Sequence, residues 1–235
     1  MTQEQPANQI STFNEKPLHA ALKEWYARPG DRFEAQVDGF IIDIVRGDLL
    51  IEIQTTSLAS LKRKLFTLVD DHQIRLVYPI AREKWIVKLA KDDQGASSRR
   101  KSPKRGKIED LFGELVSFPN LIAHPNFTLD ALLIQEEEVR HYDETRAWRR
   151  RGWVTEERRL LKVVDQRRFS TPADLSELLP ADLGEPFTTS DLAKAIARPR
   201  RLAQRMAYCL REIGEIEAAG KQGNAILYVR SREPG

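Results

Sequence analysis

The sequence predicts an α/β fold, in which a mixed β-sheet is flanked by helices, followed by a mainly α domain at the C-terminus. Residues 40–45 and 49–53 are apolar runs rich in β-branched side chains, and Arg46-Gly47-Asp48 between them indicates a β-hairpin. Helical patterns precede and follow this hairpin, and another strand pattern comes after the second helix, as in α/β proteins. The patterns after residue 146 are mainly helical, with prolines between short pieces.

Capping and turn signals define the N-terminal elements. A helix is expected from residue 15 to residue 26, because Asn14 can cap it and Pro17 is tolerated in its first turn. Asp38-Gly39 is a strong two-residue turn signal, so residues 32–37 should form a strand beside the hairpin. The hairpin therefore becomes a three-stranded meander that follows a helix.

The elements after the hairpin complete the expected core. Thr55-Thr56-Ser57 supplies a cap for a helix over residues 58–69, whose leucines repeat at intervals of three and four. Residues 73–79 and 84–89 indicate two strands, and the first should be parallel to a meander strand because a helix intervenes. Residues 91–106 are polar and basic, so a flexible loop is expected there.

Apolar periodicity predicts the remaining elements. They are a short helix at residues 107–116, a strand at 127–142, helices at 155–166 and 172–179 and, from Phe187, two helices followed by a two-stranded wing. These expectations divide the chain into an α/β core (1–90), a basic flexible loop (91–107), an extension of the core (108–145) and a helical linker with a C-terminal domain (146–235).

Three acidic side chains are expected in one row across the meander. With two-residue turns, Asp43 lies opposite Glu52 on one side and opposite Glu34 on the other. Like charges directly opposite one another destabilise a sheet, and a divalent cation, Mg²⁺ or Mn²⁺, would resolve that conflict. The alternative is a solvated outer face of an antiparallel sheet, on which acids alternate with apolar residues.

The order of helix, meander with Asp43, strand with Glu52-x-Gln54, helix and strand resembles the PD-(D/E)xK nuclease superfamily over about residues 14–90. This superfamily includes many restriction endonucleases and Holliday-junction resolvases. The resemblance implies a restriction-endonuclease-like fold and metal-dependent cleavage of DNA. It implies that Asp43 and Glu52 hold the metal, with Glu34 as a further candidate ligand.

The same resemblance points to other candidate site residues. Gln54 stands where most members have Lys, and Lys62 or Lys64 on the following helix is a candidate to supply that cation from a different position. Members often carry a Glu on the first helix, and Glu15 and Glu24 are the candidates here.

Residues 187–230 are similar to a winged helix-turn-helix domain. Pro199 suits the start of the second helix, and Leu202, Met206 and Leu210 recur on its core side. The resemblance implies that polar residues of this helix enter the major groove of DNA. The candidate DNA-binding residues are Arg198, Arg200, Arg201, Gln204, Arg205, Tyr208 and Lys221.

Charge and composition agree with a DNA-binding protein. The 235 residues carry a net charge of only +3, but residues 99–107 contain six basic side chains and no acid, as expected of a polyanion binder. The sequence shows no apolar run of membrane-spanning length and no signal-peptide pattern, and its single Cys209 excludes an intramolecular disulfide. DNA is therefore the expected partner and the cytosol the expected location, and a homodimer would suit an enzyme that cuts both strands.

Two other functions compete with a metal-dependent endonuclease. The first is a non-catalytic DNA-binding or regulatory protein on a degenerate nuclease fold, which the absence of the usual Lys at Gln54 favours. The second is an adaptor in a larger assembly, with the winged helix and the acidic segment 135–138 as docking surfaces.

Overall fold

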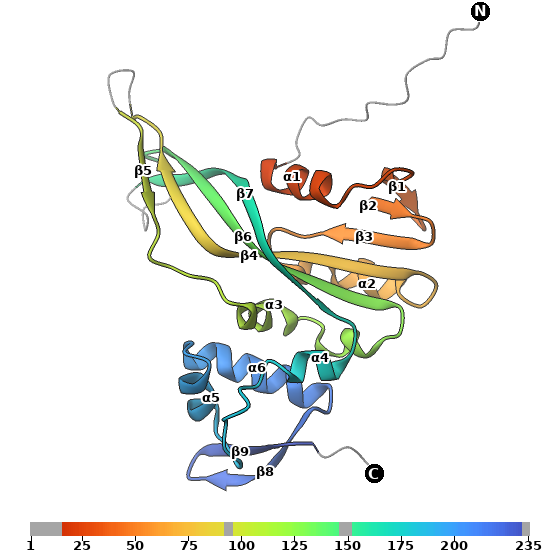
Figure 1. Ribbon diagram of the computed structural model, residues 1–235, viewed down its shortest axis with the longest axis vertical. Helices are drawn as coiled ribbons and strands as arrows, with labels where there is room; N and C mark the ends of the chain where they lie inside the picture. The colour runs from red at the N-terminus through yellow and green to blue at the C-terminus, as the bar shows by residue number, and fades with distance from the viewer. Residues whose placement is uncertain (1–15, 92–95, 146–151, 232–235) are drawn as a thin grey trace, which may run out of the picture.

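The computed structural model describes residues 16–91, 96–145 and 152–231. A seven-stranded mixed sheet has the order β1-β2-β3-β4-β6-β7, and β5 pairs with β4 outside this path. Figure 1 shows β4, β6 and β7 as long, twisted strands that extend across the molecule. The strands of the sheet are β1 (Arg32–Val37), β2 (Phe40–Arg46), β3 (Leu49–Ile53), β4 (Gln73–Lys88), β5 (Ser98–Lys101), β6 (Phe127–Tyr142) and β7 (Trp153–Phe169).

The three-stranded meander is present with the predicted register. Ile44 lies opposite Phe33 in β1 and opposite Ile51 in β3, so one step along each ladder sets Asp43 between Glu34 and Glu52 in sequence register. The Asp38-Gly39 turn has positive φ angles of 47° and 81°, which a type I′ hairpin requires. β3 then pairs in parallel with β4, as predicted for two strands joined through a helix.

Helices cover both faces of the sheet (Figure 1). α1 (Pro17–Tyr26) buries Leu18 and Leu22 in a cluster with apolar side chains of β3, β4 and β6. The opposite face carries η1 (Leu58–Leu61) and α2 (Lys62–Leu68), whose leucines belong to a second, larger cluster. The Ser57 side chain accepts a hydrogen bond from the Ala59 N–H, so this segment begins at the predicted cap.

β4 corrects the expectation of two separate strands at residues 73–79 and 84–89. It is one strand of 16 residues, with a bulge near Arg82 where its pairing with β6 shifts by one residue. Pro79 does not interrupt β4. Proline has no N–H to donate, but the pairing of β3 with β4 ends at Val77, so no β3 acceptor lies opposite Pro79.

β7 corrects the expected helix at residues 155–166. The segment is a strand along almost the whole length of β6, with bulges where their pairing shifts. Leu160 and Val163 pack near α1, whereas Leu161 and Val164, which would have shared the helical stripe, are exposed. Pairing with the long β6 therefore outweighs the local preference of this segment for a helix. The loop expected at residues 91–106 is similarly interrupted by β5.

The C-terminal elements pack against the α2 side of the sheet (Figure 1). One continuous apolar cluster joins Phe112 and Phe169 to Leu192 and Met206, so this part shares its core with the sheet. Among the residues described, every helix is too short or too polar to cross a lipid bilayer. The remaining elements are η2 (Ile108–Leu111), α3 (Phe112–Leu115), η3 (Pro119–Ala123), α4 (Pro172–Ser176), α5 (Thr189–Ala195), α6 (Arg200–Glu212), β8 (Ile216–Gln222) and β9 (Ala225–Arg230).

Candidate active site

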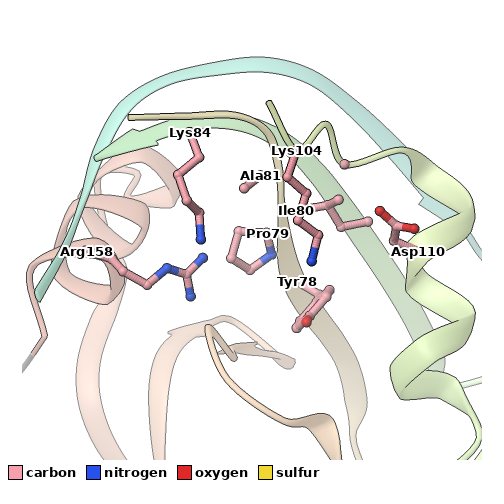
Figure 2. A pocket seen from close by; sticks show the side chains of 9 residues that line it. Tyr78, Pro79, Ile80, Ala81, Lys84, Lys104, Asp110 and Arg158 are labelled. Atoms are coloured by element: carbon pink, nitrogen blue, oxygen red, sulfur yellow. The ribbon is translucent and has the colours of Figure 1, made fainter. Parts of the chain in front are cut away.

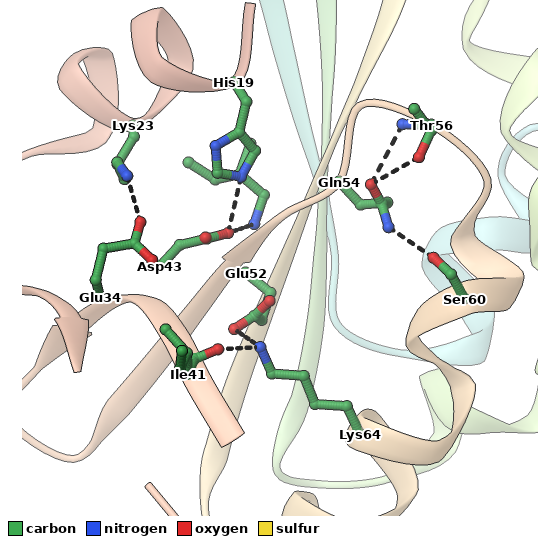
Figure 3. A network of polar contacts seen from close by, with 11 residues as sticks. His19, Lys23, Glu34, Ile41, Asp43, Glu52, Gln54, Thr56, Ser60 and Lys64 are labelled. Atoms are coloured by element: carbon green, nitrogen blue, oxygen red, sulfur yellow. Dashed lines mark hydrogen bonds and ion pairs between the residues drawn. The ribbon is translucent and has the colours of Figure 1, made fainter. Parts of the chain in front are cut away.

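The candidate site lies where the backbone ladder between β2 and β3 ends. Ile44 and Ile51 form the last pair of that ladder, and the next inward N–H of β3, that of Ile53, donates instead to the Asp43 carboxylate at 2.7 Å. His19 Nε2, from α1, lies 3.2 Å from the same Asp43 Oδ2 (Figure 3). The Asp43 side chain therefore takes the place of a backbone acceptor for the Ile53 N–H.

Glu52 is buried beside Asp43, with 5% of its surface exposed. Lys64 Nζ, from α2, makes an ion pair with Glu52 Oε1 and also donates to the Ile41 carbonyl at 2.5 Å. Figure 3 shows Lys64 approaching from α2, while His19 approaches from α1. The two carboxylates, which we call the acid pair, are thus approached by basic side chains from both helical layers.

The pKa of Glu52 is raised to about 7. Burial is the largest cause and the negative charge of Asp43 is the second, whereas Lys64 lowers the pKa. Asp43 is thus close enough to Glu52 for its charge to disfavour the ionised form of Glu52. A carboxyl group with a pKa near neutrality can change its protonation state under physiological conditions, which is a property of many functional sites.

Glu34 and Gln54 lie beside the acid pair and are engaged elsewhere. Glu34 has a φ angle of 48°, and its carboxylate makes an ion pair with Lys23 of α1. The Gln54 amide donates to Ser60 Oγ at 2.8 Å and accepts from Thr56, so it is directed away from Glu52 (Figure 3). Within the described ranges no three His, Cys, Asp or Glu side chains are grouped to hold a metal ion, which corrects the expected row of three ligands.

The contacts of the candidate residues on the two helices show which of them reach the acid pair. Lys64, and not the exposed Lys62, reaches Glu52. Glu24 is exposed on α1, and Glu15 lies outside the described residues. His19 and Lys23, which α1 presents to β2 and β1, were not among the predicted site residues. Their spacing of four residues places both on one side of a helix, and this was the available signal.

The predicted DNA-binding residues fall into two groups. Arg198 makes an ion pair with Asp110 at 2.8 Å, and Arg205 donates to the Gly113 carbonyl at 2.7 Å, so both face the rest of the protein. This corrects their assignment to a DNA-facing surface, because α6 packs against α3 on that side. The other candidates, Arg200, Arg201, Gln204, Tyr208 and Lys221, are exposed.

The acidic segment 135–138 is not an open docking surface. Glu136 and Glu138 are buried in β6, where Arg158 and Lys84 make ion pairs with them. Strand alternation explains the difference from the expectation, since every second side chain of β6 points into the protein.

A curated relative places these observations in a wider group. The protein of Treponema pallidum (strain Nichols) titled "Uncharacterized protein" is 32% identical over 228 residues, which cover 96% of this chain and 89% of that protein. No solved structure matches the chain. A family model described as "Domain of unknown function (DUF8091)" matches residues 16–170, the span from α1 to the end of β7 that contains the acid pair. The chain therefore belongs to this DUF8091 family.

Proposed function

We propose that this protein is a metal-dependent endonuclease that hydrolyses DNA phosphodiester bonds at the acid pair. The observation that carries the proposal is the buried Glu52, which is held beside Asp43 and in contact with the Lys64 ammonium group. Two carboxylates and a cation in one place are the groups that phosphate hydrolysis with a divalent metal uses.

Two carboxylates are a donor set that supports the proposal of a divalent cation. Asp43 Oδ2 is held by the Ile53 N–H and His19, while Oδ1 has no hydrogen-bond partner within the described part of the chain. Mg²⁺ commonly takes one or two carboxylates and completes its coordination with water and phosphate oxygens, so Asp43 and Glu52 suffice as protein ligands. When bound, the cation would lower the pKa of a coordinated water and stabilise negative charge on the phosphate.

The basic side chains around the pair have separate roles in this proposal. Lys64 neutralises Glu52 in the free protein, and its ammonium group would pair with a phosphate oxygen when substrate is present. The contact of His19 with Asp43 orients the imidazole ring beside the acid pair. Lys64 would therefore stabilise negative charge on the phosphate, a role that the uncharged Gln54 cannot take.

The C-terminal elements support DNA as the substrate. α5, α6 and the β8–β9 hairpin follow one another in the order of a winged helix-turn-helix domain. Arg201, Gln204 and Tyr208 are spaced by three and four residues on the exposed side of α6, and Arg200 and Lys221 add positive charge. We assign this exposed side to the major groove and Lys221 of the hairpin to the phosphate backbone.

The proposal is tested by cleavage of supercoiled plasmid with Mg²⁺ or Mn²⁺. Asp43→Asn should abolish cleavage while leaving DNA binding intact, because the substitution removes a metal ligand but little volume. Asp48→Asn, in the exposed turn of the same hairpin, is the matched control and should cleave like the wild type. Cleavage by purified Asp43→Asn at the wild-type rate would remove the assignment.

The second candidate is a non-catalytic DNA-binding protein with the same fold. The position of Gln54 favours it, because the Gln54 amide is engaged with Ser60 and Thr56 and does not face the acid pair. Retained DNA binding by the wild type, without cleavage of single-stranded, duplex or branched DNA in either metal, would select this function.

A further inference from the structure

A second polar site lies on the sheet, between β4, β7 and the loop that follows β5. It is a cavity of about 180 Å³ whose walls include Lys84, Lys104 and Arg158. Figure 2 shows the charged ends of these three side chains directed toward the space over Pro79 and Tyr78. They come from β4, the loop and β7, so the fold gathers three cations that are far apart in the sequence.

These cations are only partly neutralised. Lys84 Nζ contacts Glu138 at 2.8 Å and Glu136 at 2.9 Å, and Arg158 holds Glu136 through Nε at 2.9 Å. Three cations, with Arg140 as the third, thus face these two carboxylates. Lys104 makes no ion pair with any described residue and adds a further positive charge at the cavity. Positive charge therefore exceeds negative charge here.

The remaining acid on the cavity wall does not cancel this excess. Asp110 makes an ion pair with Arg198 at 2.8 Å and accepts the Lys107 backbone N–H at 3.1 Å. Its charge is therefore already compensated by Arg198. An anion is the ligand that this balance of charges favours.

Hydrogen-bond donors are also left over in the cavity. An ammonium group has three N–H donors and a guanidinium group five. Lys84 donates one hydrogen bond, to Glu138 at 2.8 Å, and its 2.9 Å approach to Glu136 Oε1 is an ion pair without hydrogen-bond geometry. Arg158 uses three donors, two on Glu136 and one on the Thr55 carbonyl at 2.7 Å. The side chain of Lys104 adds its own three donors to those that remain.

The loop that carries Lys104 is fixed against β4. The Ser102 N–H donates to the Lys84 carbonyl at 2.8 Å, and the Gly106 N–H donates to the Ala81 carbonyl at 2.9 Å. A Cβ atom at position 106 would lie 2.6 Å from the Ala81 carbonyl oxygen, so only glycine allows this approach. The position of Lys104 over the cavity is therefore a built feature of the loop.

We propose that this cavity binds a phosphate group carried by a nucleic acid. Its volume is smaller than the roughly 300 Å³ at which small-molecule pockets begin, which suits a ligand group of the size of a phosphate. Arg and Lys donors at fixed positions are the groups that bind phosphate oxygens most strongly.

Arg158 also connects the cavity to the acid pair. It donates to the carbonyl of Thr55, which lies three residues after Glu52 on the segment that leaves β3. That the bound phosphate belongs to the strand being cut rests on the proposed nuclease function. Binding of the phosphate itself does not, because none of the cavity residues belongs to the acid pair.

The test measures binding in EDTA, so that cleavage plays no part. Lys104→Ala removes an exposed cation that has no ion-pair partner in the described part of the chain, so the variant should fold normally, which circular dichroism can check. Lys162→Ala is the matched control, because Lys162 is also exposed, lies on the same strand as Arg158 and is outside the cavity. Titration calorimetry with inorganic phosphate should show about tenfold weaker binding for Lys104→Ala and no change for Lys162→Ala. Equal affinities of the two variants, or no phosphate binding by the wild type, would overturn the proposal.

Fluorescence anisotropy with single-stranded oligonucleotides then identifies the source of the phosphate. Preference of the wild type for a 5′-phosphate over a 5′-hydroxyl, lost in Lys104→Ala, supports a terminal phosphate. Equal weakening of both oligonucleotides by Lys104→Ala supports a backbone phosphate. Asp43→Asn should bind phosphate like the wild type, so a failure of the nuclease assignment leaves this result unchanged.

Discussion

Two buried carboxylates of the same sheet, Glu52 of β3 and Asp130 of β6, have pKa values that are shifted in opposite directions. Asp130 is completely buried and accepts hydrogen bonds from Tyr26 at 2.7 Å, from Gln166 at 2.8 Å and from Arg168 at 2.7 and 2.9 Å. Burial alone would raise the pKa of Asp130, but the Arg168 and Tyr26 hydrogen bonds prevail and lower it.

Glu52 has far fewer compensating contacts. Among the described residues its side chain has one cationic partner, Lys64. Burial and the like charge of Asp43 therefore raise its pKa to about 7. The difference shows that burial does not by itself make a carboxylate reactive. The number of donors around the charged form decides whether the group is a structural anchor or remains available to a ligand.

The largest expected effect is the loss of the structural anchor. Asp130→Asn should lower the free energy of unfolding by about 3 kcal/mol, because it leaves Arg168 and Tyr26 without their charged acceptor. Urea denaturation measures this loss. Asp165→Asn, an exposed substitution on β7, should change the free energy by no more than about 0.5 kcal/mol. A loss below about 1 kcal/mol for Asp130→Asn would contradict the anchoring role.

A divalent cation should stabilise the acid pair and not the anchor. At a hundredfold excess over Kd, Mg²⁺ or Mn²⁺ should raise the free energy of unfolding by about 2.7 kcal/mol in the wild type. Thermal unfolding with and without metal measures the shift. Asp43→Asn should abolish it, and an equal shift in that variant would place the metal elsewhere.

The raised pKa of Glu52 predicts a pH dependence of stability. Because the folded-state pKa is about 7 and the ordinary value 4.5, protonated Glu52 contributes stability that is fully present below pH 4.5 and is lost as the pH rises through 7. In EDTA, the wild type should therefore lose about 2 kcal/mol relative to Glu52→Gln between pH 5.5 and 8. Urea denaturation at both pH values measures the difference, and parallel pH profiles for the two proteins would refute the raised pKa.

The smallest expected effect is the loss of one hydrogen bond to Asp130. Tyr26→Phe removes one of several donors to that carboxylate, so it should cost about 1 kcal/mol of unfolding free energy, with Arg168 and Gln166 still in place. Tyr208→Phe, at an exposed site on α6, is the matched control in the same urea titrations. A loss as large as that of Asp130→Asn would mean that Tyr26 organises the whole network.

The parts of the fold that could be predicted are those specified by local interactions. The meander register follows from two short turns, Asp38-Gly39 and Gly47-Asp48, and from side chains that alternate across a strand. β7 could not be predicted in the same way, because its residues favour a helix when considered alone. Its strand conformation depends on the long edge that β6 offers, and β6 is distant in the sequence.

The same distinction applies to the candidate site. The proximity of Asp43 and Glu52 follows from the register, and α2 begins close enough to β3 for Lys64 to have been a candidate. The contact of His19 depends on how α1 crosses the sheet, which no local pattern specifies. The phosphate cavity required β4 to be continuous and β7 to be a strand, and the sequence interpretation had neither.

The firm attachment of α6 to the rest of the protein has a consequence for any duplex that it holds. Arg205 bonds to Gly113, Arg198 bonds to Asp110, and the apolar side of α6 shares one core with Phe112 and Phe169. The reading surface and the cutting centre of the proposed enzyme would therefore keep a constant separation. Such an enzyme would cut at a fixed number of base pairs from the sequence that it binds.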